Sequence, residues 1–198
     1  MSAISVTPVT LEGARVRLEP LSMERHFDGL AAIAFDPDIW RLGLSTMETP
    51  DDLRRYISIA LREQAEGRAL PFATIDTASG RIAGSTRFGN LDPRNRRAEI
   101  GWTWLARPFQ RTHVNTEAKF LMLRHAFETW DCVRVELKTD VRNRRSRDAM
   151  LRMGALEEGI LRSYQISERG VVRDTVFYSV LATEWPGVKE RLLAKMAR

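Results

Sequence analysis

Cysteine is almost absent from this sequence of 198 residues, in which Cys132 is the single example. One thiol excludes internal disulfides and the cysteine clusters of zinc fingers and iron–sulfur sites. Histidine is scarce too, and His26, His113 and His125 lack the spacing of a metal site such as HExxH. We therefore expect a protein without a metal.

Long apolar runs are also missing. No stretch approaches the roughly 18–20 apolar residues that cross a bilayer, and the first residues lack the basic and apolar blocks of a secretion signal. Hydrophobic residues make up 43% and charged residues 29%, as in an ordinary globular protein. Together these features predict a cytoplasmic protein that does not bind membranes.

Lysine occurs at only four positions among 31 basic residues, so most of the positive charge belongs to arginine. The formal net charge is +5, and arginines cluster at 94–97 and 142–147. Arginine suits bidentate phosphate contacts, although such clusters are also typical of solvated loops. Because no aromatic residues are interleaved with them, we expect no general nucleic-acid binding.

The first half of the sequence combines strand and helix patterns. Alternation at 15–19 predicts a strand, and 22–35 reads as a helix that Ser22 caps and that ends at Asp36-Pro37. A second helix is expected at 50–66, with Pro50 in its first turn and Gly67 just beyond its end. Turn residues then separate three predicted strands, at 69–76, 81–89 and 97–105.

The second half predicts a β-α-β unit and a closing hairpin. Apolar residues in 116–130 recur at helical spacing, namely Leu123, Ala126, Phe127 and Trp130. A strand at 133–139 should pair in parallel with 97–105, and a helix at 144–153 ends at Gly154. The remaining predicted elements are strands at 157–167 and 171–181 and a helix at 185–198. We predict an α/β sandwich in one domain, 1–198, with its core at about 11–183.

Two junctions between a strand and the following helix are candidate binding sites. Where strand 97–105 meets the next helix, backbone N–H groups and the helix dipole form an anion site, with Arg107 and Arg111 nearby. After strand 133–139, Asn143 and Ser146 lie three residues apart and share one face of the helix start. Asn143 could equally be a structural cap that accepts the N–H of residue 146.

The order of elements and three segments resemble a known family. The segments are AEIGWTWLARPFQRTHVNTEAK, VELKTDVRNRRSRDAMLRMGALEEG and VRDTVFYSVL. The chain resembles the GNAT-superfamily N-acetyltransferases, in the RimJ/RimL-like branch of ribosomal-protein N-terminal acetyltransferases, from about residue 11 to 186. The resemblance implies a GNAT-type acyl-CoA N-acyltransferase fold, with a mixed, mostly antiparallel sheet flanked by helices. It also implies acetyl-CoA as cosubstrate.

The resemblance assigns cofactor-binding roles to particular residues. The pyrophosphate loop of the family matches Gln110, Arg111, Thr112, His113, Val114, Asn115 and Thr116. Trp104 and Leu105 match the strand edge that pairs with the pantetheine amides, Asn143 would bind the pantetheine arm, and Ser146 could protonate the departing thiolate. Where the family loop commonly has glycine, this chain has Arg111 and His113. Their side chains could obstruct phosphates, yet the donors are backbone groups, so we expect acetyl-CoA to bind with a Kd of about 1 μM or less.

Catalytic roles are also implied. A glutamate on the matching strand often acts as general base, which makes Glu99 the candidate, with an ion pair to Arg96 or Arg97 as the alternative. Tyr164 and Tyr178 are alternatives to Ser146 as proton donor. Backbone N–H groups near 102–104 would polarise the acetyl carbonyl.

The acceptor is expected to be a primary amine. A protein N-terminal α-amine, with a pKa near 7.7–8.0, demands less of a base than a lysine with a pKa near 10.4. A small-molecule amine is the alternative acceptor, and a module that binds coenzyme A without turnover is the alternative function. Members of this branch are often dimers, so the resemblance allows a homodimer.

Overall fold

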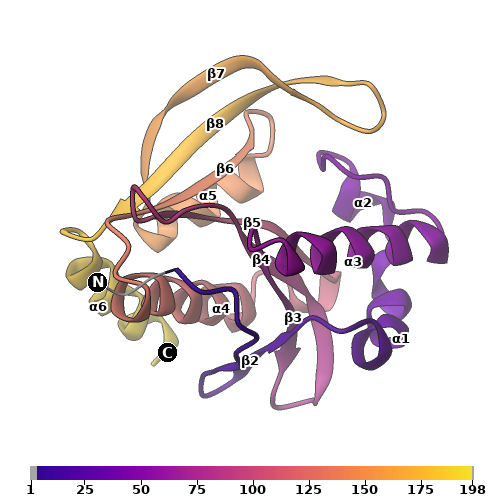
Figure 1. Cartoon of the computed structure of the whole chain (residues 1–198), viewed down its shortest axis with the longest axis horizontal. Helices are drawn as coiled ribbons and strands as arrows, with labels where there is room; N and C mark the ends of the chain where they lie inside the picture. Colours follow the sequence, from indigo (N-terminus) through magenta and orange to yellow (C-terminus); the bar gives the residue numbers. More distant parts are fainter. Residues whose placement is uncertain (1–3, 198) are drawn as a thin grey trace.

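The structure is a computed structural model and describes residues 4–197. Its eight strands form one sheet in the order β1-β2-β3-β4-β5-β6-β8-β7 (Figure 1). All neighbours are antiparallel except β5 and β6, which are parallel. This confirms the predicted mixed, mostly antiparallel sheet. The strands are β1 (Leu11–Glu12), β2 (Val16–Pro20), β3 (Leu70–Asp76), β4 (Arg81–Asp92), β5 (Arg97–Leu105), β6 (Arg134–Asp140), β7 (Leu156–Ile166) and β8 (Val172–Leu181).

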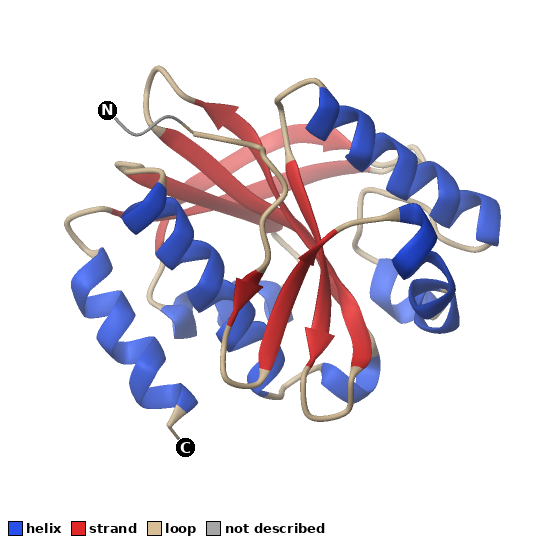
Figure 2. Ribbon diagram, turned by 60° about the horizontal axis from the view of Figure 1, so that its bottom comes forward, coloured by secondary structure: helices blue, strands red, loops and turns tan. Residues whose placement is uncertain are grey.

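Helices cover both faces of the sheet (Figures 1 and 2). Helices α1 and α3 pack on β4 and β3, whereas α4, α5 and α6 pack on the opposite face. The helical elements are α1 (Met23–Ala34), α2 (Pro37–Trp40), α3 (Pro50–Ala65), η1 (Arg107–Phe109), α4 (His113–Arg124), η2 (His125–Thr129), α5 (Arg144–Met153) and α6 (Trp185–Met196). None of the helices within residues 4–197 combines the length and the apolar character needed to cross a bilayer.

Two apolar clusters lie on opposite faces of the sheet. The larger joins the sheet to α4 and α6, and the smaller lies beneath α1, α2 and α3. The predicted stripe on the central helix is buried in the larger cluster, as are Cys132 and Trp185. Burial raises the pKa of the Cys132 thiol to about 11, so the thiol is the stable form at neutral pH.

Local capping explains most helix boundaries. Ser22 and Thr49 accept N–H groups of the first turns of α1 and α3, and Gly154 ends α5 with a φ of 111°. The short helix α2 was not expected: Asp36-Pro37 ends α1 and also begins α2, because the Asp36 carboxylate caps the N–H of Asp38.

The central helix differs from its predicted range. α4 begins at His113, three residues before the predicted start, because Thr112 acts as its cap and accepts the N–H of Val114. Glu117 consequently lies in the second turn of α4. It is buried and accepts the backbone N–H of Arg15 at 3.1 Å. After Arg124 the helix continues as the wider π-helical turn η2.

Candidate active site

The sheet opens between β5 and β6. The two strands pair only where Arg97–Glu99 face Arg134–Glu136, whereas β6 continues along β8 as far as Asp140. From Gly101 to Leu105, β4 is the one strand paired with β5 in the described part of the chain. The edge of β5 that faces β6 can therefore accept an extended ligand by strand-like hydrogen bonding.

A backbone kink lies within this opening. Trp102 has a φ of 50°, in the left-handed region, and the pairing of β4 with β5 shifts register between Ser85 and Arg87. Such a conformation costs about 1–3 kcal/mol in a residue other than glycine. The Tyr56 hydroxyl donates to the Trp102 carbonyl at 3.1 Å and supports the kink from α3. The kink reorients peptide groups beside the opening.

The loop before α4 presents backbone donors. Thr112 donates its hydroxyl to the Phe109 carbonyl at 2.8 Å, which fixes the entry to the helix. Within residues 4–197, the N–H groups of Arg111, His113 and Asn115 have no protein acceptor. Unpaired N–H groups at a helix N-terminus bind anions, and no acidic residue lies in this first turn.

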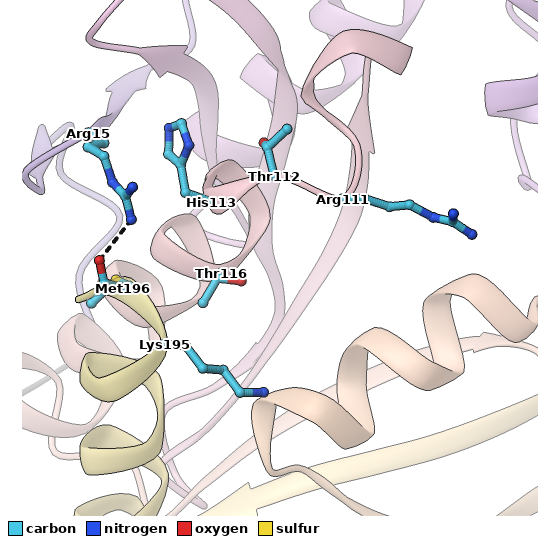
Figure 3. A pocket seen from close by; sticks show the side chains of 7 residues that line it. All are labelled: Arg15, Arg111, Thr112, His113, Thr116, Lys195 and Met196. Atoms are coloured by element: carbon cyan, nitrogen blue, oxygen red, sulfur yellow. Dashed lines mark hydrogen bonds between the residues drawn. The ribbon is translucent and has the colours of Figure 1, made fainter. Parts of the chain in front are cut away.

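A cavity of about 370 Å³ adjoins this loop (Figure 3). It lies between the start of α4 and the end of α6, where Arg15 donates to the Met196 carbonyl at 2.9 Å. Three of its side chains are cationic and none is acidic, which suits a phosphate group. The lining residues are Arg15, Arg111, Thr112, His113, Thr116, Lys195 and Met196.

The two bulky residues of the loop leave its donors exposed. His113 Nε2 lies 3.0 Å from the Asp76 carboxylate at the end of β3, so the ring is tied to that strand. Hydrogen bonds from Ser79, and then the one from His113, lower the pKa of Asp76. Arg111 has a φ of 61°, and its side chain extends away from His113 and Arg15 (Figure 3). Neither side chain folds back over the loop.

The start of α5 lies close to the same loop. Arg145 donates to the Gln110 side chain at 3.1 Å, and Gln110 itself donates to the Leu105 carbonyl at 2.9 Å. Asn143 caps α5 by accepting the N–H of Ser146 at 3.2 Å, as its capping interpretation predicted. Two helix N-termini therefore meet beside the end of β5, although the roles of Asn143 and Ser146 toward a cofactor stay predictions.

Glu99 is 3% exposed on β5, just before the kink. Its Oε2 accepts from Asn90 Nδ2 at 2.6 Å and lies 2.8 Å from Lys138 Nζ on β6. The alternative pairing with Arg96 or Arg97 is wrong, because those arginines pair with other carboxylates, namely Asp131, Asp92 and Glu136. Oε1 faces Gly101 and has no hydrogen-bond donor within residues 4–197. One oxygen of this buried carboxylate therefore remains able to accept a proton.

The tyrosine alternatives have different surroundings. The Tyr178 hydroxyl is buried, donates to Glu157 at 2.8 Å and accepts from Arg147 at 3.2 Å. Desolvation, the largest influence, raises its pKa. Tyr164 is exposed and packs edge-on against Phe177. Tyr178 is thus committed to structural hydrogen bonds.

Three tryptophans near the kink separate into two groups. Trp40 and Trp104 pack together in the smaller core, with ring centroids 5.3 Å apart. Trp102 lies under the Arg87 guanidinium, which is 4.0 Å from its ring centroid. Trp40 and Trp104 therefore belong to the core beneath α1, α2 and α3.

The β7–β8 hairpin reaches across to the segment between α2 and α3. The Glu168 N–H donates to the Leu44 carbonyl at 2.9 Å, and the Glu168 carboxylate accepts the Thr46 N–H at 2.6 Å. Beneath this contact is a small cavity of about 40 Å³, whose lining includes Tyr56 and Arg87. The hairpin thus covers the α3 side of the kinked strand.

Sequence reasoning missed several polar residues around this opening. Arg15 lines the cavity from a distant part of the sequence, and Tyr56 braces the kink. Lys119 is buried and contacts Thr103 beside the kink. Its position four residues before Leu123, on the apolar stripe of the helix, was the available signal.

Comparisons with known proteins agree with this geometry. The family profile described as "Acetyltransferase (GNAT) domain" matches residues 15–156. A putative ribosomal N-acetyltransferase of Bacillus subtilis, YdaF, is 38% identical over 110 residues, which are 56% of this chain and 59% of that protein. A GCN5-related N-acetyltransferase from Brucella melitensis is 32% identical, with a TM-score of 0.90 over 98% of this chain and 88% of that one.

A third relative carries a ligand. Mycobacterium smegmatis RimJ, solved in complex with CoA-disulfide, is 26% identical, with a TM-score of 0.80 over 98% of this chain and 97% of that one. The opened sheet, the donors before α4 and these matches lead to one conclusion. This chain belongs to the GNAT acetyltransferase family, a group of acyltransferases, and is similar to its RimJ-like members.

Proposed function

We propose that this protein transfers an acetyl group from acetyl-CoA to a primary amine, and that the amine is the N-terminal α-amine of a protein. The observation that carries the proposal is the adjacency of two features: the unpaired edge of β5 and the backbone donors before α4. A pyrophosphate attached to an extended amide arm matches both at once. The CoA derivative in the related RimJ structure supports the donor.

The residues present fit such a donor. We place the diphosphate at the loop that comprises Gln110, Arg111, Thr112, His113, Val114, Asn115 and Thr116. The proposed donors are the unpaired N–H groups of Arg111, His113 and Asn115, because the N–H groups of Gln110 and Val114 already donate to the Arg107 carbonyl and the Thr112 hydroxyl. Arg15 and Arg111 add positive charge, and the cavity beside them has room for phosphate. Trp104 and Leu105 border the unpaired edge, and Gln110 occupies the Leu105 carbonyl. We assign Asn143 and Ser146 to the pantetheine arm because they begin α5 beside this edge.

Proton removal from the acceptor is assigned to Glu99. The carboxylate is buried beside the kink, and its Oε1 retains a lone pair for a proton or a bridging water. Lys138 and Asn90 hold Oε2 in place. Backbone N–H groups at the kink of β5 would polarise the thioester carbonyl in the direct attack.

The acceptor assignment rests on energetics and on the relatives. Neutralising a lysine amine at pH 7.4 costs about 4 kcal/mol, and an α-amine costs less than about 1 kcal/mol. A single glutamate meets the smaller requirement. The name of the YdaF relative, a putative ribosomal N-acetyltransferase, is in keeping with a protein acceptor.

The test measures thiol release from acetyl-CoA with three acceptor sets: peptides with free N-termini, the same peptides blocked at the N-terminus, and small amines such as polyamines and amino acids. We expect turnover with free N-termini and none with the blocked peptides. Turnover confined to small amines would overturn the acceptor. Calorimetry without heat at millimolar acetyl-CoA would overturn the transferase assignment.

A further inference from the structure

Lys119 is a buried amine without an acidic partner. It is 7% exposed on α4, and its Nζ donates to Thr103 Oγ1 at 2.6 Å and to Thr86 Oγ1 at 3.3 Å. The two hydroxyl oxygens are 2.7 Å apart, so the three groups form a closed triangle. No carboxylate within residues 4–197 forms an ion pair with Lys119. Burial of an ammonium without a counter-charge is costly, which makes this arrangement unusual.

One member of the triangle reaches the surface. Thr86 is 1% exposed on β4, whereas Thr103 is exposed on β5. Thr103 directly follows the kink at Trp102, in the part of β5 that β6 no longer accompanies. Its hydroxyl therefore connects the buried amine to the opening in the sheet.

We propose that Thr103 donates its hydroxyl proton to the departing thiolate of coenzyme A and that Lys119, acting through Thr103, replaces that proton. This inference rests on the proposed acetyl transfer. Thr103 would be the group that touches the sulfur, and Lys119 a positioning residue and proton source behind it. Ser146 then has no part in proton donation.

The step balances as follows. The acceptor nitrogen forms a bond to the acetyl carbon, and the carbon–sulfur bond breaks with its electron pair on sulfur. The Thr103 proton moves to sulfur, and a proton from Lys119 Nζ moves to the Thr103 oxygen. Glu99 takes the proton that the acceptor nitrogen loses. After the thiol leaves, Glu99 releases its proton to water and Lys119 regains one from water through Thr103.

The acidity of Lys119 fits this role. Desolvation lowers its pKa to about 7, so both the ammonium and the neutral amine are accessible near neutral pH. A cysteine thiol has a pKa of about 8.5 and an ordinary alkyl thiol a higher one, and the Lys119 ammonium is therefore acidic enough to supply a thiolate. A lysine with the ordinary pKa of about 10.4 would be a weaker acid than the thiol.

No surrounding charge offsets the effect of desolvation on the pKa of Lys119. Desolvation is the one cause of this pKa shift found among the described residues. Charged side chains of the flanking elements are engaged with other groups: Glu117 with the Arg15 N–H, Glu99 with Lys138, Arg87 with Glu63, and Glu128 with Lys189. Lys119 therefore titrates against two neutral hydroxyls.

A direct measurement of the titration needs no turnover. The chain has only four lysines, so selective isotope labelling of lysine gives a simple side-chain NMR spectrum. We expect one lysine to titrate near pH 7 in the free protein, and its signal to be missing from Lys119→Arg. Four lysines titrating near pH 10 would overturn the proposal.

Kinetics test the connection through Thr103. Thr103→Val removes the hydroxyl without a change of shape, and Thr103→Ser retains it. We expect kcat to fall at least about tenfold in Thr103→Val, the Kd of acetyl-CoA to stay within about twofold, and serine to restore turnover. Normal kcat in Thr103→Val would overturn the proposal.

The pH profile separates proton supply from a structural role. Lys119 must be protonated to act, so the ratio of wild-type kcat to Thr103→Val kcat should fall as pH rises through about 7. The ratio cancels the ionisation of the acceptor. Lys119→Arg keeps a charged donor that does not release its proton, and should lose the same pH dependence. A flat ratio, or normal behaviour of Lys119→Arg, would overturn the proposal.

The two proposals fail in different ways. If the wild-type protein releases no thiol with any amine, the proposed function fails and this inference falls with it, whatever the NMR titration shows. If the wild type is active and Thr103→Val matches it, acetyl transfer stands and the proton pathway is wrong.

Discussion

The two carboxylate oxygens of Glu99 have different surroundings and different roles. Oε2 receives the Asn90 amide and the Lys138 ammonium, and Oε1 is turned toward Gly101 and the kinked strand. The first oxygen fixes the side chain, and the second can take a proton. Sequence reasoning identified Glu99 on the right strand, but it could not identify Lys138, because that contact depends on the register of β5 against β6.

Replacement of Glu99 by glutamine tests its role as base. We expect Glu99→Gln to lower kcat about a hundredfold while the Kd of acetyl-CoA, measured by calorimetry, stays unchanged. Glu136→Gln is the matched control, since Glu136 lies opposite Glu99 on β6 but pairs with Arg97 and Arg134. A Glu99→Gln protein with normal kcat would assign proton removal to water.

Arg111 combines a strained backbone with a useful charge. Its φ of 61° costs about 1–2 kcal/mol for a residue with a Cβ atom. We expect Arg111→Gly to be about 1 kcal/mol more stable than Arg111→Ala in urea unfolding. Both variants should bind acetyl-CoA several-fold more weakly than the wild type, because both lose the guanidinium. Equal stability of the two variants would show that the loop relaxes.

At the scale of elements, the start of α5 serves both folding and the site. Asn143 accepts the Ser146 N–H, and removal of such a cap costs about 1 kcal/mol. We expect Asn143→Ala to lose that stability and Asn143→Asp to retain most of it, as measured by thermal unfolding. If Asn143 also binds the pantetheine arm, both variants should weaken acetyl-CoA binding. Unchanged binding in both would leave the residue as a cap alone.

Local signals predicted most elements, and tertiary contacts account for the differences. Ser22, Pro50 and Gly154 marked helix ends correctly, because capping and backbone conformation are properties of neighbouring residues. The start of α4 was misplaced because the apolar stripe begins later than the Thr112 cap. The separation of β5 from β6 and the kink at Trp102 depend on contacts across the sheet, so local patterns contain no sign of them.

For the whole molecule, Asp140 links stability to pH. It is fully buried at the end of β6 and binds Arg142 and Arg173. Hydrogen bonds from Arg142, followed by the charges of Arg142 and Arg173, lower its pKa from 3.8 to about 2. A depressed folded-state pKa stabilises the protein above about pH 4, by about 2 kcal/mol, and this contribution is lost as pH falls toward 2.

Acid titration of the unfolding free energy measures this contribution. We expect the wild type to lose stability steeply between pH 4 and 2, in one cooperative step if residues 1–198 form the single predicted domain. Asp140→Asn should be less stable at pH 7, because Arg173 is left buried and unpaired, and its acid limb should be shallower. Asp51→Asn, at an exposed carboxylate, is the control. A parallel loss of stability in all three proteins would refute the assignment.

Glu168 joins the β7–β8 hairpin to the segment between α2 and α3 over the α3 side of the kink. This contact restricts which molecules can be substrates. Because this contact fixes the hairpin, an acceptor has to enter the space beneath it. A flexible chain terminus enters as a single extended strand. A lysine on a folded surface is flanked by chain on both sides, so two strands would have to enter together. Under the proposed function, this contact would favour acceptors with a free chain end over residues within a folded surface.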